Sequence, residues 1–153
     1  MSRLMLTFSA ALLVVGPVHA DDDLTTEEKQ VVELVNAERK KADLPPLTAN
    51  LKLMKAARGH SANMARKKEL AHDLDCKGPG ERLKDVEYSH GGWGENCAAG
   101  QKTPTEAMDS WLKSEPHKAN LLGKSYQEIG VGLAMADDGT VYWTQVFGIP
   151  AKD

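Results

Sequence analysis

The amino-acid sequence predicts an α+β domain with a small, mostly antiparallel sheet. Two observations carry this prediction. Helix caps and helical apolar spacing mark segments that begin near residues 25, 50 and 103. The chain then ends in two strand-like segments, residues 129–135 and 141–147, separated by the turn residues Asp137-Asp138-Gly139. Helices, a loop, a strand, a helix and a final hairpin, in that order, are typical of the α+β class.

Residues 1–20 have the pattern of an export signal. Arg3 precedes an apolar run over residues 4–15, and Val18-His19-Ala20 places small residues where a signal peptidase reads them. We therefore expect cleavage near Ala20, a frayed N-terminus over residues 21–24 and a single domain over residues 25–150. The apolar run is shorter than the roughly 20 residues that a membrane span needs, and no later segment is comparable. These features predict a secreted monomer, either extracellular or periplasmic.

The charge pattern argues against one class of partner. The 153 residues include 19 Lys and Arg against 22 Asp and Glu, which gives a formal net charge of −3. These charges are spread along the chain and form no basic stripe, so nucleic acid is not expected as a partner.

The first two helices are predicted by their caps and their apolar stripes. Thr25 and Glu28 form a capping box, and the first helix should end near Ala42 because Pro45-Pro46 cannot continue it. A second helix is expected from Asn50 to about Lys68, with one face formed by Leu51, Met54, Ala57, Ser61 and Met64. His60 lies on this helix. We expect it to be a hydrogen-bonded histidine at the edge of the core and not a metal ligand.

Helical periodicity disappears between residues 70 and 92, apart from one possible turn around residues 81–83. This long connection carries His72, Cys76 and His90, and loops of such length in compact domains are usually functional or tied down. It leads into Gly94-Glu95-Asn96, and residues 97–99 are expected to form a short strand.

A third helix is predicted from Thr103, with Pro104 at its first position and Glu106 at its third. Pro116 should end it, and His117 follows at once. Six apolar residues of this helix and the final hairpin are expected to be mostly buried: Trp111, Leu112, Ile129, Val131, Trp143 and Phe147.

Glu95 is the first candidate for chemistry, because it lies in a glycine-rich turn within residues 91–97. Glycines permit positive φ or close backbone approach, so the carboxylate can be aimed at a site. His72 and His117 flank it in the chain. Neutral imidazoles suit zinc and other transition metals, while a carboxylate serves as ligand, as a partner that orients a ligand, or as general base. Two histidines fall short of four ligands, so any ion would keep open positions and bind weakly.

Cys76 and Cys97 are the only cysteines, and both follow the export signal. An oxidising compartment favours a disulfide between them, which would staple the loop of His72 to the strand of Glu95. Two free buried thiols and an intermolecular bridge are the alternatives. Neither cysteine is placed for Cys-His catalysis, and the chain lacks both the His-Glu-x-x-His pattern and a nucleophile elbow.

Short motifs spread over residues 31–148 resemble one known family when taken in order. They are Leu34-Val35-Asn36-x-Glu38-Arg39, Leu44-Pro45-Pro46-Leu47, Ala56-Ala57-x-x-His60-Ser61, Leu70-Ala71-His72, Gly94-Glu95-Asn96, Trp111-x-x-Ser114-x-x-His117-x-x-Asn120-Leu121-Leu122, Glu128-Ile129-Gly130-Val131-Gly132 and Tyr142-Trp143-Thr144-Gln145. The sequence resembles the CAP superfamily of cysteine-rich secretory, antigen 5 and pathogenesis-related proteins, in its short bacterial form.

The resemblance implies an α-β-α sandwich with a central cleft lined by two histidines and acidic residues. It assigns His72 and His117 as the two histidines and Glu95 as the first acid. Larger members carry a second Glu where this chain has Ser114, and Glu115 comes one position late, turned by about 100° on a helix. Ser114, Glu115 and Asn96 are therefore further cleft candidates.

Two classes of function follow from the resemblance and the residues. The favoured one is a non-catalytic extracellular binding module that holds a lipid, a peptide or a cell-envelope component, with zinc or another divalent cation weakly bound in the cleft. The alternative is a metal-dependent hydrolase of peptide or ester bonds, in which Glu95 acts as the base.

Overall fold

A computed structural model of the chain describes residues 24–152. Residues 1–23, with the expected export signal and most of the expected frayed segment, lie outside the described part. Leu24 was expected to fray, but it is half-buried and packs against the core. Within the described residues, no helix is both long and apolar enough to cross a membrane.

Four strands form one sheet in the order β1-β3-β4-β2. The strands are β1 (Thr48–Ala49), β2 (His90–Ala99), β3 (Glu128–Met135) and β4 (Val141–Pro150). The short β1 pairs parallel with β3, whereas β3 and β2 each pair antiparallel with β4. The sheet is therefore mostly antiparallel, as predicted, and the expected hairpin is the β3-β4 pair.

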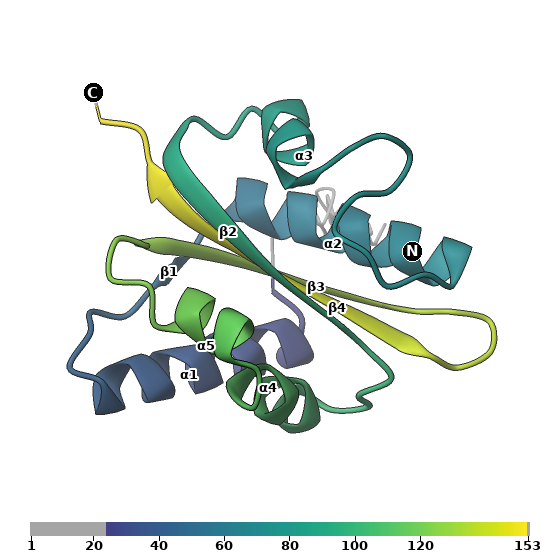
Figure 1. Ribbon diagram of the computed structural model, residues 1–153, viewed down its shortest axis with the longest axis horizontal. Coiled ribbons are helices and arrows are strands. Elements are labelled where there is room, and N and C mark those ends of the chain that lie inside the picture. Colours follow the sequence, from purple (N-terminus) through teal and green to yellow (C-terminus); the bar gives the residue numbers. More distant parts are fainter. Residues whose placement is uncertain (1–23, 153) are drawn as a thin grey trace, which may run out of the picture.

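Helices cover both faces of this sheet (Figure 1). One layer holds α1 (Thr26–Lys41), α4 (Pro104–Leu112) and α5 (Glu115–Leu121), and the other holds α2 (Leu51–Lys67) and α3 (Pro79–Asp85). This arrangement confirms the α-β-α sandwich. The helix α3 was expected only as a single turn, and its seven residues hold the loop that carries His72.

The N-terminal ends of α1, α2 and α4 have the caps that the sequence predicted. Thr25 and Glu28 form a complete capping box, Asn50 caps α2, and Thr103 caps α4. Glu28 also receives two hydrogen bonds of 2.7 Å from Arg58. The first helical layer is thereby tied to the second by a partly buried, bidentate ion pair.

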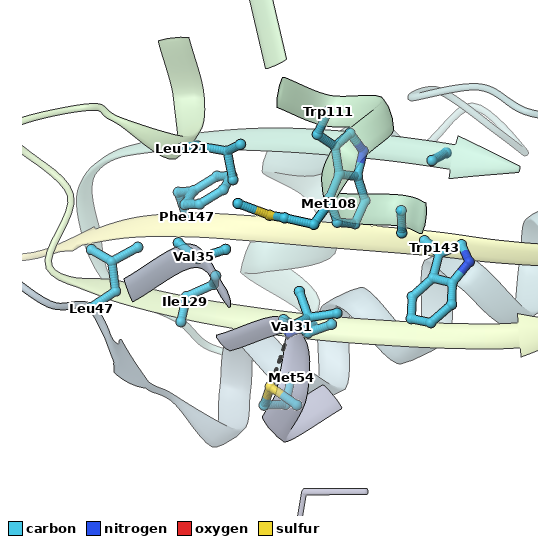
Figure 2. Close-up of a cluster of buried hydrophobic side chains, with 13 residues drawn as sticks. Val31, Val35, Leu47, Met54, Met108, Trp111, Leu121, Ile129, Trp143 and Phe147 are labelled. Atoms are coloured by element: carbon cyan, nitrogen blue, oxygen red, sulfur yellow. Dashed lines mark hydrogen bonds between the residues drawn. The ribbon is translucent and has the colours of Figure 1, made fainter. Parts of the chain in front are cut away.

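The helix α2 packs backbone against backbone on β3. A Cβ atom added to Gly130 would come within 2.1 Å of the Leu53 carbonyl carbon, and one added to Gly132 within 2.3 Å of the Arg58 nitrogen. The amide of Val131, between these glycines, donates to Met54 Sδ at 3.0 Å. Figure 2 draws this hydrogen bond as a dashed line beside the core. No residue larger than glycine fits at either position without moving the helix.

The main hydrophobic core fills the space between the sheet and the layer of α1, α4 and α5 (Figure 2). Trp111, Ile129, Val131, Trp143 and Phe147 have no exposed surface, which confirms five of the six burial predictions. Leu112 is only half-buried.

The strand β2 is much longer than the three residues expected. It begins at His90, and the glycine-rich stretch lies inside it, with a register shift between His90 and Gly92. The expectation of a turn was wrong because these glycines serve close packing. A Cβ atom at Gly94 would approach Tyr126 Oη to 2.4 Å.

Side chains cover the outer edge of β2, which has no neighbouring strand on that side within the described sheet. Trp111 Nε1 donates to the carbonyl of Cys97 at 3.2 Å, and Asn120 Nδ2 donates to the carbonyl of Glu95 at 3.1 Å. A strand edge satisfied in this way resists pairing with a second sheet. These bonds also fix α4 and α5 beside the strand that carries Glu95.

Candidate functional site

Glu95 lies at the centre of a polar cluster on β2. Its side chain is only 2% exposed, and its two oxygens have different partners. Oε1 accepts a hydrogen bond from His72 Nδ1 at 2.8 Å, and Oε2 accepts one from Arg82 Nη2 at 2.5 Å. An ionised carboxylate can only accept hydrogen bonds, so the proton of the neutral His72 ring lies on Nδ1, next to Glu95. The lone pair of the ring is then on Nε2.

Arg82 fixes the loop around His72 as well as the carboxylate. Its Nη1 donates to the carbonyl oxygens of His72 at 2.8 Å and Lys77 at 3.0 Å. The loop before α3 is therefore held to β2 by one guanidinium. The His72 side chain remains 53% exposed, so the ring opens to solvent on the side away from Glu95.

The pKa values of this pair follow from its contacts. Burial pushes the pKa of Glu95 upward, but the hydrogen bond from His72 and the charge of Arg82 outweigh burial, and the pKa lies below its usual range. The hydrogen bond to Glu95 raises the pKa of His72, against the smaller effect of its burial. The carboxylate is thus stabilised in its ionised form.

His117 lies in the first turns of α5 and is half-buried. Burial lowers the pKa of His117, and the charge of His72 lowers it further. Asn96 positions this helix. Its Nδ2 donates to the carbonyl of His117 at 3.0 Å and to Gln145 Oε1 at 3.1 Å, while Asn120 donates to its Oδ1 at 2.9 Å.

The remaining cleft candidates lie around this cluster in different ways. Asn96 is completely buried, so it fixes the position of α5 and does not face an open cleft. Ser114 is the half-buried N-cap of α5, and its side chain makes no capping hydrogen bond. Glu115 is exposed in the first turn of α5.

His60 is hydrogen-bonded at the edge of the core, as expected, with Nε2 2.8 Å from the carbonyl oxygen of Ala71. It also belongs to the polar cluster, because the same nitrogen lies 3.9 Å from Glu95 Oε1. Burial lowers its pKa, which favours the neutral ring. The sequence offered no sign of this second role.

Both cysteines are free thiols in the structure, in contrast to the predicted disulfide. Cys76 is exposed in a tight turn, where its φ is 58°. Cys97 is buried on the same face of β2 as Glu95, and its thiol donates to Glu95 Oε1 at 3.6 Å. Burial raises the pKa of Cys97 far above its ordinary value, and the negative charge of Glu95 adds to the effect. Hydrogen bonds of Arg82, and not a disulfide, tie the His72 loop in place.

Within the described residues, one group of three side chains could hold a metal ion. It consists of His60, Glu95 and Cys97, which are all buried and whose donor atoms lie within 4.8 Å of one another. The predicted pair of His72 and His117 is not part of this group, and of the two only His72 contacts Glu95 by a hydrogen bond.

A model of the Cysteine-rich secretory protein family matches residues 32–147 of this sequence. The chain belongs to the CAP family. Its sequence is 40% identical over 129 residues to YkwD, an uncharacterized protein of Bacillus subtilis strain 168. That match covers 84% of this chain and 49% of YkwD, so the chain spans about half the length of this relative.

Solved structures of other proteins share the fold. An extracellular protein with an SCP domain from Bacillus anthracis has a TM-score of 0.73 at 29% identity, over 82% of this chain and 44% of that one. An outer surface protein from Borrelia burgdorferi has a TM-score of 0.76 at 23% identity, over 80% and 92% of the two chains. The second likeness supports the fold alone.

Proposed function

We propose that this CAP domain is a non-catalytic extracellular binding module. In this proposal His72 and His117 hold a divalent cation such as zinc at the mouth of the cleft, and the ion helps to bind a lipid, a peptide or a cell-envelope component. The observation that carries the proposal is the clamping of Glu95 between His72 and Arg82. It supports an oriented ligand histidine and disfavours catalysis by the carboxylate.

The residues present fit a weakly held cation. Glu95 accepts a hydrogen bond of 2.8 Å from Nδ1 of His72, and the Nε2 lone pair is therefore directed away from Glu95. A carboxylate that orients a ligand histidine in this way is a common partner in metal sites. With two imidazole ligands, water would complete the coordination shell, and a bound ligand would replace that water. A crystal structure of NaASP2 with Zn2+ shares the fold at 12% identity, with a TM-score of 0.61.

The contacts of Glu95 and Cys97 argue against the hydrolase. A general base works best with a pKa near the operating pH, whereas the contacts of Glu95 with His72 and Arg82 hold its pKa low. Cys97 is no nucleophile, because burial and the adjacent carboxylate raise its pKa and keep the thiol protonated. The side chains at this centre are therefore arranged for binding.

Substituting either His72 or His117 by alanine should abolish the zinc binding that the pair supports, because each supplies one of only two protein ligands. Calorimetric titration of the purified protein with zinc measures this effect. His90→Ala is the matched control, since His90 stacks on Tyr88 with ring centroids 6.0 Å apart, outside the cluster. An equal loss in all three variants would contradict the assignment.

Activity assays with and without zinc separate the module from the hydrolase. We expect no turnover of nitrophenyl esters or of unfolded protein substrates above the zinc-only background. Turnover that disappears in Glu95→Gln would contradict the binding module and restore the hydrolase.

Zinc affinity should fall as the pH drops, because a proton and the metal compete for Nε2 of His72. The hydrogen bond to Glu95 raises the pKa of His72, so the loss should begin above the ordinary imidazole value of about 6.5. Burial lowers the pKa of His117, which therefore contributes only at lower pH. Below the pKa of His72, affinity should drop about tenfold per pH unit. Binding that is undiminished at about pH 5 would argue against histidine ligands.

A further inference from the structure

A buried donor set around Glu95, distinct from the histidine pair of the proposed function, combines nitrogen, oxygen and sulfur. Around Glu95 Oε1, Cys97 Sγ lies at 3.6 Å and His60 Nε2 at 3.9 Å. All three side chains are buried, and their donor atoms lie within 4.8 Å of one another. We propose that His60, Glu95 and Cys97 form an inner site for a thiophilic divalent cation of the zinc type, separate from the outer histidine pair.

The spacing of these atoms is close to what such an ion requires. Zinc binds nitrogen and oxygen at about 2.0–2.2 Å and sulfur at about 2.3 Å, so neighbouring ligands of a tetrahedral site are about 3.3–3.6 Å apart. The two separations from Glu95 Oε1, 3.6 and 3.9 Å, need to close by at most a few tenths of an ångström, whereas the third pair, His60 and Cys97, lies within 4.8 Å and closes by rotation of the side chains. His72 borders this group, with its Nδ1 3.8 Å from Cys97 Sγ.

The charges in the site also suit a dication. On binding, the Cys97 thiol gives up its proton to solvent, and thiolate and carboxylate together offset the two charges of the ion, so the cluster with Arg82 carries a net charge of +1. Arg82 donates to the other carboxylate oxygen, Oε2, and leaves Oε1 to the ion. It also keeps its hydrogen bonds to the carbonyl oxygens of His72 and Lys77. Oε1 has two lone pairs, so it can bind the ion and still accept the His72 hydrogen bond.

His60 is held loosely enough to change partner. One hydrogen bond, from Nε2 to the Ala71 carbonyl, fixes its tautomer, while its buried Nδ1 has no hydrogen-bond partner among the described residues. Ligation through Nε2 moves the ring proton to Nδ1 and replaces that one hydrogen bond by a metal–nitrogen bond. His60 is only 1% exposed, so bulk water has little access to Nε2 and does not compete with the ion for it.

A groove of about 730 Å³ between α2 and α3 supplies an entry path. Its lining includes His60 and Arg82, together with Leu74 and Val86. The groove reaches His60, and His72 is not among its lining residues. An accessible route is a requirement for any buried metal site.

Cobalt titration under reducing conditions tests the inner site directly, because a thiolate ligand produces a sulfur-to-cobalt charge-transfer band in the near ultraviolet. The wild-type protein should develop this band to saturation at one equivalent. Cys97→Ser should eliminate it, and His60→Gln should weaken cobalt binding at least about 100-fold, since loss of a ligand exceeds the 10–100-fold cost of losing a ligand's partner. Cys76→Ser, which removes the exposed thiol, should retain the band.

The inner site is wrong if the wild-type protein binds cobalt without a thiolate band, or if Cys76→Ser removes the band and Cys97→Ser does not. The His117→Ala variant separates the two sites. It should keep the thiolate band while it loses the zinc held by the outer pair. If cobalt binds without a thiolate band, and His117→Ala abolishes this binding, the inner site is wrong and the binding module stands. If the band forms, and His117→Ala changes the binding of neither cobalt nor zinc, the inner site stands and the outer histidine pair is wrong.

A calorimetric measurement avoids the risk that Cys97→Ser fails to fold. In the His117→Ala variant, which lacks the outer pair, zinc binding at about pH 8 should release the proton of the Cys97 thiol. Calorimetry in two buffers of different ionisation enthalpy counts that proton. Zinc bound with no proton released would overturn the proposal.

Discussion

Replacing Arg39 with alanine is expected to lower the free energy of unfolding by about 3–5 kcal/mol, because each orphaned buried acceptor costs roughly 1–3 kcal/mol. Arg39 has no exposed surface, and within the described residues it pairs with carbonyl oxygens and with no carboxylate. Its Nε donates to Pro45 at 2.8 Å, and its Nη1 donates to Leu121 at 3.0 Å and Gly123 at 2.9 Å. One side chain of α1 thus fixes the loop after α1 and the C-terminal end of α5.

Lys40→Ala is the matched control for Arg39, because it removes an exposed cation from the neighbouring position of α1. Urea unfolding should show a change of a few tenths of a kcal/mol for Lys40→Ala, as is usual for exposed substitutions. If Arg39→Ala were as mild as Lys40→Ala, the carbonyls would not depend on the guanidinium.

Substituting Trp143 by alanine should cost about 3–5 kcal/mol, the range for large aromatic residues in a packed core. Trp143 has no exposed surface, and its Nε1 donates to the carbonyl of Gln101 at 2.8 Å. The substitution therefore opens a cavity between the sheet and the helical layer and also orphans a carbonyl. Thermal and urea unfolding, followed by circular dichroism, measure the loss.

Trp93→Ala provides the comparison for Trp143, since Trp93 lies on β2 but is 40% exposed. Its replacement should cost well under half as much. Equal losses would mean that aromatic area, and not burial in the core, sets the stability of this domain.

Features that depend on neighbouring residues could be predicted from the sequence. The capping box of Thr25 and Glu28, the cap of Asn50 and the turn at Gly139 are local, so their chemistry is visible in a few consecutive residues. Two strand-like segments on either side of the turn residues 137–139 likewise predicted the hairpin. The family motifs then supplied the layers that local patterns leave open.

Features that depend on distant contacts could not be predicted in this way. The glycines of residues 91–94 suggest a flexible turn, whereas Tyr126 and Ile149 pack against them inside a strand. Arg82 looks like an ordinary exposed cation in the sequence, and only the fold brings it to Glu95. The same holds for Cys97, whose burial beside a carboxylate replaces the disulfide that the export signal suggested.

The principal residues of the candidate site were proposed from the sequence, whereas the contacts around them could not be. Family motifs pointed to His72, Glu95 and His117, and the structure joins the first two by a hydrogen bond of 2.8 Å. The roles of Arg82, Asn96 and His60 depend on hydrogen bonds between distant segments, and such contacts leave no periodic pattern in the sequence. One signal was present: a helical turn next to the His72 loop that carries an arginine.

Diffraction from crystals soaked in zinc, recorded at the zinc absorption edge, tests the central claim most directly. The binding module predicts an anomalous peak about 2.0–2.1 Å from one ring nitrogen each of His72 and His117, the usual zinc–nitrogen distance. Glu95 should then still accept a hydrogen bond from Nδ1 of His72. Zinc found only on surface carboxylates, with both imidazoles free, would contradict the account.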